Sequence, residues 1–228
     1  MLDIHTHILP GVDDGAKSHR QALQMLYAAR SAGVDVLVAT PHIKHTAADL
    51  SGITDAYLWL KPHAQGIGIR LLMGFEVSYK VLLNLPCSEL QHYCISGTNN
   101  LLLELDSFHL FPQWNRVLGT LVRAGYEPVI AHPERYAYIQ EHPEIIGKMK
   151  RYGCRIQIDA RAFLKPPWNA ERRTAAKIKR LGWMDYLASD AHCPQDYRRM
   201  KPVLRKYQGR MSGECLFQGN ILGLTSSW

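Results

Sequence analysis

Strand-like and helix-like segments alternate along most of this chain, and that alternation limits its possible folds more than any other feature. Short apolar segments rich in Val, Ile and Leu alternate with segments of helical character. Strands that alternate with helices build βαβ units and a parallel sheet. The predicted strands are residues 1–7, 34–39, 69–77, 100–105, 127–131, 154–159 and 186–189. The predicted helices are residues 18–32, 47–66, 114–124, 143–152 and 170–181, with further helix toward the C-terminus. Ser18 is the expected cap of the first helix, and Gly33 is expected to end it.

Seven predicted strands in 228 residues fit a single α/β domain over residues 1–228 that forms a closed or nearly closed barrel. The composition, 46% hydrophobic and 21% charged, is ordinary for a soluble globular protein. No apolar run approaches the ~18–20 residues needed to span a membrane, and the opening residues lack a signal-peptide pattern. We therefore expect a cytoplasmic protein. Its five cysteines are odd in number and form no C-x-x-C pair, so no disulfide framework is expected.

A histidine pair lies at the end of the first predicted strand. His5 and His7 are two residues apart, so in a strand both imidazoles point to the same side. Neutral imidazoles suit transition metals such as zinc, manganese and iron. Asp3 points to the same side of the strand as His5 and His7, and it could orient one imidazole by accepting a hydrogen bond from its second N–H. An H-x-H motif is weak by itself, so the prediction of a metal site depends on the residues at the ends of the other strands.

Metal-ligand residue types recur at the ends of six predicted strands. They are His5, His7, His42, Glu76, Glu104, His132, Asp190 and His192, with Asp13 and Asp14 on the first loop. Each one alone could be a solvated loop residue. A carboxylate at the end of an apolar strand is costly to bury without a partner, however, and barrel enzymes build their active sites at this rim. The set exceeds what one tetrahedral ion can use, so we predict two or three divalent ions bridged by carboxylates such as Glu76.

Such clusters are typical of phosphate ester hydrolysis, in which metal ions activate water and bind the attacking and leaving oxygens. Arg135 is then the candidate to bind the phosphoryl oxygens, and Arg198 or Arg199 could assist. Alternatively, Arg135 forms a surface salt bridge with Glu134 or Glu141. The formal net charge of +7 also indicates an anionic partner, although the basic clusters could be solvated helix faces.

The motif set resembles the polymerase and histidinol phosphatase (PHP) superfamily, and within it the bacterial CpsB/CapC-type tyrosine-protein phosphatases of capsule and exopolysaccharide systems. The resemblance rests on DIHTHILPGVDDG at residues 3–15, TPH at 40–42, GFE at 74–76, LE at 103–104, AHPERY at 131–136 and SDAH at 189–192. It implies a distorted (β/α)7 TIM-like barrel with divalent metal ions. Manganese is the expected metal, with iron, zinc and magnesium as alternatives. The implied ligands are His5, His7, Asp14, His42, Glu76, Glu104, His132, Asp190 and His192.

The resemblance also implies a reaction and a partner. The expected reaction is hydrolysis of phosphotyrosine on the tail of a membrane-associated bacterial tyrosine kinase that controls polysaccharide synthesis. Arg135, Asp14 and His42 would be catalytic, with Arg135 and Arg198 binding phosphate. Tyr197 stands where the family's second phosphate-binding arginine usually lies, so Arg198 is assigned in its place. Residues 45–66 match poorly and could recognise a different substrate tail. Peripheral membrane contact and a homo-oligomer stay open.

Three alternatives compete with this interpretation. His192-Cys193 followed by Arg199 matches the H-C-x5-R motif of cysteine-dependent phosphatases, but Pro194 lacks the N–H that a phosphate-binding loop needs. A second alternative keeps the metals and changes the substrate to a small ester such as histidinol phosphate or to a nucleic-acid 3′ end. We expect no nucleic acid, because no aromatic-rich basic stripe is present. The third is a metal-binding or kinase-anchoring protein without turnover.

Overall fold

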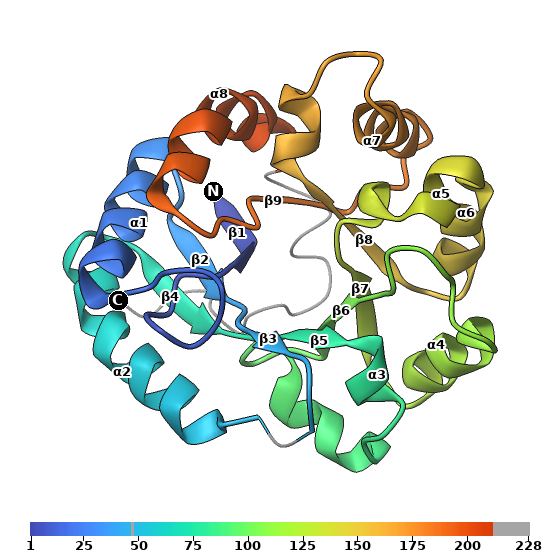
Figure 1. Ribbon diagram of the computed structural model, residues 1–228, viewed down its shortest axis with the longest axis horizontal. Coiled ribbons are helices and arrows are strands. Elements are labelled where there is room, and N and C mark those ends of the chain that lie inside the picture. Colours follow the sequence, from blue (N-terminus) through green and yellow to red (C-terminus); the bar gives the residue numbers. More distant parts are fainter. Residues whose placement is uncertain (47, 212–228) are drawn as a thin grey trace.

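Parallel strands curl around a central core, and the longer helices lie outside them (Figure 1). The computed structural model describes residues 1–46 and 48–211. The strands are β1 (Leu2–Thr6), β2 (Val36–Ala39), β3 (His42–Ile43), β4 (Arg70–Met73), β5 (Glu76–Ser78), β6 (Asn100–Glu104), β7 (Glu127–Ile130), β8 (Arg155–Asp159) and β9 (Tyr186–Ala188). The α-helices are α1 (His19–Ala32), α2 (Leu50–Gly66), α3 (Tyr79–Leu82), α4 (Trp114–Arg123), α5 (Ala137–Glu141), α6 (Glu144–Arg151), α7 (Ala170–Arg180) and α8 (Pro194–Met211). Three short 3₁₀ helices complete the set: η1 (Cys87–Tyr93), η2 (Pro133–Arg135) and η3 (Ala160–Leu164).

The strands form two parallel sheets, ordered β1-β2-β4 and β3-β5-β6-β7-β8-β9. The strand predicted over residues 69–77 is split into β4 and β5 around Gly74, and β3 follows β2 after Pro41. Pro41 has no N–H to give to a ladder, which suits it to such a break. Because β3 pairs with β5, His42 lies opposite Glu76 in the register. The break therefore brings two predicted metal ligands side by side.

The ring closes between its first and last strands. The backbone N–H of Asp190 donates to the carbonyl of His5 at 2.8 Å, and that of His7 donates to Ala191 at 2.9 Å. Thr6 and Ala191 also form a parallel bridge. The predicted closed or nearly closed α/β barrel is therefore confirmed, and its closure brings residues 190–192 next to the histidine pair.

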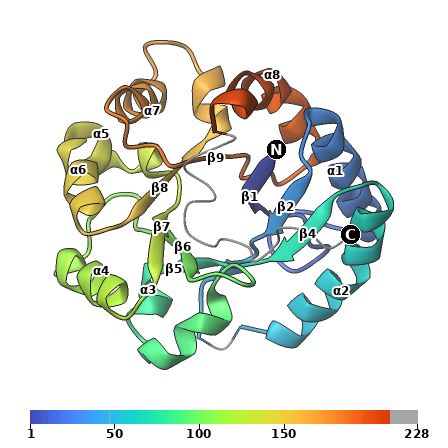
Figure 2. The same ribbon diagram turned by 180° about the vertical axis from the view of Figure 1, so that it is seen from behind.

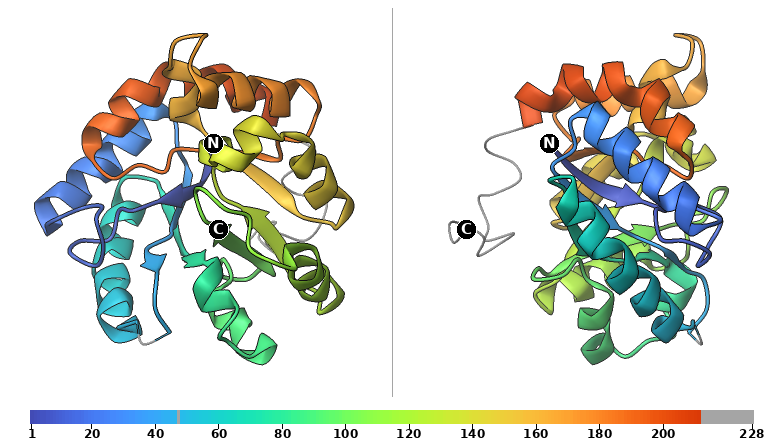
Figure 3. Two further views of the ribbon diagram at one scale, coloured as in Figure 1. Left: turned by 45° about the vertical axis from the view of Figure 1, so that its right-hand side comes forward. Right: turned by 90° about the vertical axis from the view of Figure 1, so that its left-hand side faces the viewer.

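Apolar side chains fill the interior and the space between strands and helices. Ile4, Val38, Leu102 and Val129 are buried inside the barrel. Seen from behind, α1 and α2 cover β1, β2 and β4, while α4, α6 and α7 lie outside β7 and β8 (Figure 2). Helix α8 packs beside α1 (Figure 3). The helices cover the outside of the strands, so the loops that follow the strands are the expected location of an active site.

Several local signals act as the sequence predicts. Ser18 caps α1 by accepting from the N–H of Gln21, and Gly33 ends the helix at φ +97°. Helix α2 begins at Leu50, later than the predicted start at residue 47, because Asp49 caps it. The predicted helix beyond Met211 lies outside the described residues. Across residues 1–46 and 48–211, no helix is long and apolar enough to cross a membrane.

Candidate metal centre

The loops at one end of the barrel bring eight of the nine predicted ligands into three overlapping groups. Within each group, the potential ligand atoms lie within 4.8 Å of one another. The groups are His7-Asp14-His42-His192, His5-His7-Glu76-Asp190 and His42-Glu76-Glu104. His7, His42 and Glu76 each belong to two groups, so the three groups form one continuous cluster.

His5 and His7 meet as their spacing predicts. Their Nε2 atoms are 3.2 Å apart, and both side chains are buried. Glu76 Oε2 lies 3.2 Å from Nε2 of His5 and 3.3 Å from Nε2 of His7. Asp190 Oδ1 lies 3.3 and 3.1 Å from the same two nitrogens. Two imidazole nitrogens and two carboxylate oxygens therefore converge on one point.

Hydrogen bonds behind the imidazoles fix their orientation. Nδ1–H of His5 donates to Oε1 of Gln157 at 3.0 Å, and Nδ1–H of His7 donates to Asp13 at 2.7 Å. These bonds leave the Nε2 lone pair of each ring facing the cluster, as in metal-binding histidines. Asp3 does not have the predicted orienting role. Its carboxylate accepts instead from Tyr197 and from backbone N–H groups.

This donor set fits a cation. Lone pairs and negative oxygens that face one another in a buried site repel unless protons or a metal ion lie between them. Burial lowers the pKa of His7, but hydrogen bonds to carboxylates outweigh burial and raise that pKa well above its ordinary value. Burial raises the pKa of Glu76, but the imidazoles around it, His5 first, hold it well below its usual range. Glu76 Oε2 and His132 Nδ1 are also buried without a hydrogen-bond partner among the described residues.

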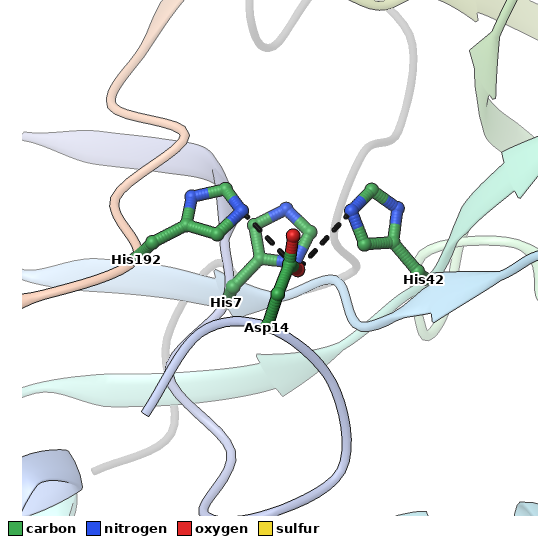
Figure 4. A group of neighbouring side chains, drawn as sticks. All are labelled: His7, Asp14, His42 and His192. Atoms are coloured by element: carbon green, nitrogen blue, oxygen red, sulfur yellow. Dashed lines mark ion pairs between the residues drawn. The ribbon is translucent and has the colours of Figure 1, made fainter. Parts of the chain in front are cut away.

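The group His7-Asp14-His42-His192 lies at the more exposed side of the cluster. Asp14 Oδ1 faces Nε2 of His42 at 3.4 Å and Nε2 of His192 at 3.5 Å (Figure 4). His7 lies behind them, with its ring stacked on that of His192. The side chain of Asp14 is 60% exposed, so this carboxylate borders solvent. The group joins the first rim loop to residues after β2 and β9.

Glu76 is the central carboxylate. Its Oε2 lies 2.9 Å from Nδ1 of His42, and its Oε1 lies 2.8 Å from Nε2 of His132. His132 thus faces Glu76 without being part of a group. Glu104 joins Glu76 and His42, and burial followed by the charge of Glu76 raises the pKa of Glu104.

Two site residues adopt an unusual backbone conformation. His132 has φ +33° and Asp190 has φ +46°, and Gln113 is the one other non-glycine residue with positive φ in the described part of the chain. The left-handed region is unfavourable for side chains with a Cβ, and such strain persists where the surrounding structure enforces it. Here the strain coincides with residues that face the cluster.

Arg135 and Arg161 are the two arginines that contact Asp190 beside the cluster. Nη2 of Arg135 donates to Asp159 and, at 2.6 Å, to Asp190, so Glu134 and Glu141 are not its partners. Arg161, which belongs to none of the sequence motifs, contacts the same two carboxylates. Arg198 instead lies exposed on α8 and lines a cleft with Gln24, Tyr27 and Ser31 of α1. Helix α8 turns Arg198 outward and Tyr197 inward, and the phosphate-binding role of Arg198 stays a prediction.

The cysteine motif does not form a phosphate-binding loop. The backbone N–H groups of His192 and Cys193 both donate to Oδ2 of Asp196. A carboxylate thus occupies the donors that an anion would need, and Arg199 is exposed. This geometry disfavours attack by Cys193.

A cleft borders the exposed side of the cluster. It has a volume of about 540 Å³ and lies between the first rim loop and the start of α2. Its lining includes Asp14, His42, Lys44, Asp49 and Ile53. A volume of this size can hold a small molecule or a few residues of a bound peptide.

Residues 1–216 match the protein family described as capsular polysaccharide synthesis, CpsB/CapC. CapC of Staphylococcus aureus is 31% identical over 198 residues, which cover 84% of this chain and 77% of that protein. The tyrosine-protein phosphatase YwqE of Bacillus subtilis is 28% identical over 197 residues, with the same coverage of 84% and 77%.

A solved structure agrees with these matches. It comes from crystal structures of YwqE from Bacillus subtilis and CpsB from Streptococcus pneumoniae, described as metal-dependent tyrosine phosphatases. The match has a TM-score of 0.74 and 25% identity, and covers 94% of this chain and 89% of the other.

Proposed function

The chain belongs to the CpsB/CapC family of capsular polysaccharide synthesis, and from this premise we propose that it is a metal-dependent protein-tyrosine phosphatase. The observation that carries the proposal is the cluster of three overlapping ligand groups beside a pair of arginines. Such a site combines metal ligands with cationic groups that bind phosphate. The relatives named as tyrosine phosphatases support the same reaction.

We assign nine residues to two or three divalent cations, with manganese as the expected metal and iron, zinc or magnesium as alternatives. They are His5, His7, Asp14, His42, Glu76, Glu104, His132, Asp190 and His192. When bound, such ions act as Lewis acids on phosphoryl oxygens and lower the pKa of water. Gln157 and Asp13 hold the imidazole Nε2 lone pairs toward the cations.

Three residues would contact the reacting ester. Asp14 and His42 border both the ligand groups and the adjoining cleft, so a phosphate in that cleft would touch them. Arg135 stays protonated at all relevant pH values and is held in place by Asp159 and Asp190. Its remaining N–H groups can bind non-bridging phosphoryl oxygens.

The substrate class follows from the family and the cleft. We propose that a tyrosine-phosphorylated protein is the substrate and that the phosphorylated tail of a membrane-associated tyrosine kinase supplies it. The cleft next to Asp14 leaves room for residues that flank the phosphotyrosine. We further propose that residues 1–228 act as one domain in the cytoplasm.

The test compares three substrates with the purified wild-type chain. A phosphotyrosine peptide, a phosphoserine peptide and histidinol phosphate are each assayed with manganese and then with a strong chelator. Manganese-dependent phosphate release from the phosphotyrosine peptide alone supports the proposal. Activity confined to histidinol phosphate would exclude a protein substrate. Full activity after rigorous chelation would exclude the metal mechanism.

A further inference from the structure

We propose that Arg161 is a second phosphate-binding residue that acts beside Arg135. The inference deepens the proposed function, since it assigns a further residue to the phosphate of the same substrate. It rests on the position of Arg161 at the rim and on the two carboxylates it shares with Arg135.

The two guanidinium groups are held by one pair of carboxylates. Asp159 Oδ2 accepts from Nη2 of Arg135 and, at 3.0 Å, from Nε of Arg161. Asp190 Oδ2 accepts from Nη2 of Arg135 at 2.6 Å and from Nη2 of Arg161 at 2.8 Å. Both carboxylates are buried, whereas the side chains of Arg135 and Arg161 are 28% and 34% exposed. The carboxylates therefore anchor two partly exposed cations side by side.

The local sequence fixes Arg161 in this position. Asp159 ends β8, and its Oδ1 caps η3 by accepting from the backbone N–H of Arg161 at 2.8 Å. Nη2 of Arg161 also donates to the backbone carbonyl of Asp190 at 3.1 Å. Hydrogen bonds thus hold both the backbone and the guanidinium of Arg161, so its side chain loses little rotamer freedom when phosphate binds.

Free donors remain on both arginines. A guanidinium has five N–H groups. The bonds of Arg135 run through Nη2, and those of Arg161 run through Nε and Nη2. Within the described part of the chain, Nη1 of each arginine makes no hydrogen bond to protein. Two adjacent guanidinium groups with free N–H donors can bind several oxygens of one phosphate.

The charge balance favours an anion at this place. Asp159 and Asp190 together carry two negative charges, which the two arginines already balance. Asp190 Oδ1 also faces the imidazoles of His5 and His7, so the carboxylate interacts with the ligand group as well as with the two arginines. Three divalent cations would bring six positive charges to the four remaining carboxylates, Asp13, Asp14, Glu76 and Glu104, and would leave the site net positive by two charges. A dianionic phosphate monoester would restore the balance.

The experiment measures binding of inorganic phosphate to the metal-loaded protein by isothermal titration calorimetry, with metal content determined in parallel. The variants are Arg161→Gln, Arg161→Lys and Arg135→Gln. Arg198→Gln tests the position predicted from sequence, and Arg173→Gln is the matched control, an exposed arginine whose Nη1 donates to the carbonyl of Trp168. Kinetics with the phosphotyrosine peptide are recorded for each variant.

We expect Arg161→Gln and Arg135→Gln each to weaken phosphate binding on the order of 10- to 100-fold, as for loss of a charged hydrogen-bond donor. Metal content should stay at the wild-type value. The phosphate affinity of Arg161→Lys should lie between those of the wild type and Arg161→Gln, because lysine keeps the charge and loses the planar set of guanidinium donors. Arg173→Gln and Arg198→Gln should bind phosphate as the wild type does.

Two outcomes would overturn the proposal. If Arg161→Gln binds phosphate as tightly as Arg173→Gln does, Arg161 does not contact phosphate. If it loses metal along with phosphate, its role is to hold Asp190. Failure of the proposed function gives a different pattern. The wild type would then bind phosphate in an Arg161-dependent manner, supporting this inference, and would not hydrolyse phosphotyrosine.

Discussion

Gln157 offers a test of how the metal ligands are oriented. Its side chain is fully buried, and its Oε1 accepts from Nδ1–H of His5 at 3.0 Å and from the backbone N–H of His132 at 3.3 Å. One amide oxygen thus serves a predicted ligand from β1 and another that lies just after β7. We expect Gln157→Leu, which keeps a similar volume and removes the acceptor, to weaken metal binding.

The magnitude follows from the two donors left behind. The backbone N–H of His132 would be buried without an acceptor, at a cost of about 1–3 kcal/mol. His5 can avoid the same cost by moving its proton from Nδ1 to Nε2, which turns an N–H toward the cluster. That tautomer cannot bind a cation through Nε2. Loss of such an orienting partner typically lowers metal affinity about 10- to 100-fold.

The assay separates the two effects. Manganese affinity is measured by competition with a fluorescent chelator, and stability is measured by urea unfolding of the metal-free protein. Gln157→Glu keeps an acceptor at this position, so it should bind manganese more tightly than Gln157→Leu does. Gln91→Leu is the control, because Gln91 donates to the carbonyl of Thr98 away from the cluster. Wild-type manganese affinity in Gln157→Leu would refute the reasoning.

Three further predictions concern the same rim. Complete removal of divalent metal should abolish turnover and lower the thermal midpoint in differential scanning fluorimetry. At a metal concentration 100-fold above Kd, bound metal contributes about 2.7 kcal/mol, so an unchanged midpoint would contradict metal binding to the folded state. Gly15→Ala should lower manganese affinity at least about tenfold, because its Cβ would lie 1.9 Å from the carbonyl oxygen of His7 and shift the loop that carries the adjacent ligands. Gly66→Ala, with no atom within 4 Å of the added Cβ, should keep wild-type affinity in the same titration. Cys193→Ser should retain kcat/KM on the phosphotyrosine peptide within about twofold, since backbone donors at this loop are bound to Asp196, and loss of all turnover with metals retained would revive the cysteine mechanism.

The alternation of strands and helices could be predicted because each βαβ unit carries its own local signals. The cap at Ser18 and the stop at Gly33 set α1 as predicted. The break around Gly74 could not be predicted, because residues 69–77 read as one continuous apolar strand. Its cause lies in pairing with neighbours: β4 pairs with β2, whereas β5 pairs with β3 and β6. Such pairing is tertiary information.

The positions of the proposed ligands could be predicted because they lie at the ends of strands in a parallel sheet, and those ends meet at one rim. The orienting groups were harder to find. Asp13 lies beside Asp14 in a loop and could be suspected, whereas Gln157 lies inside a predicted strand and looks like an ordinary inward-facing residue. Its role depends on β8 passing next to both β7 and β9. Sequence spacing does not contain that information.

Arg161 shows which rule could have found the second arginine. The carboxylates of Glu76 and Glu104 stand out because each lies at the end of an apolar strand. Asp159 ends the predicted strand 154–159 in the same way, and the same rule places it at the rim as a buried carboxylate that needs a cation. The nearest cationic side chain after it in the sequence is Arg161. A fixed distance from His192 points instead to Tyr197, and a helix turns the neighbouring Arg198, assigned in its place, toward solvent. Rim position after a strand is therefore the stronger guide to phosphate-binding residues in this fold, because strand ends converge whereas positions along an outer helix do not.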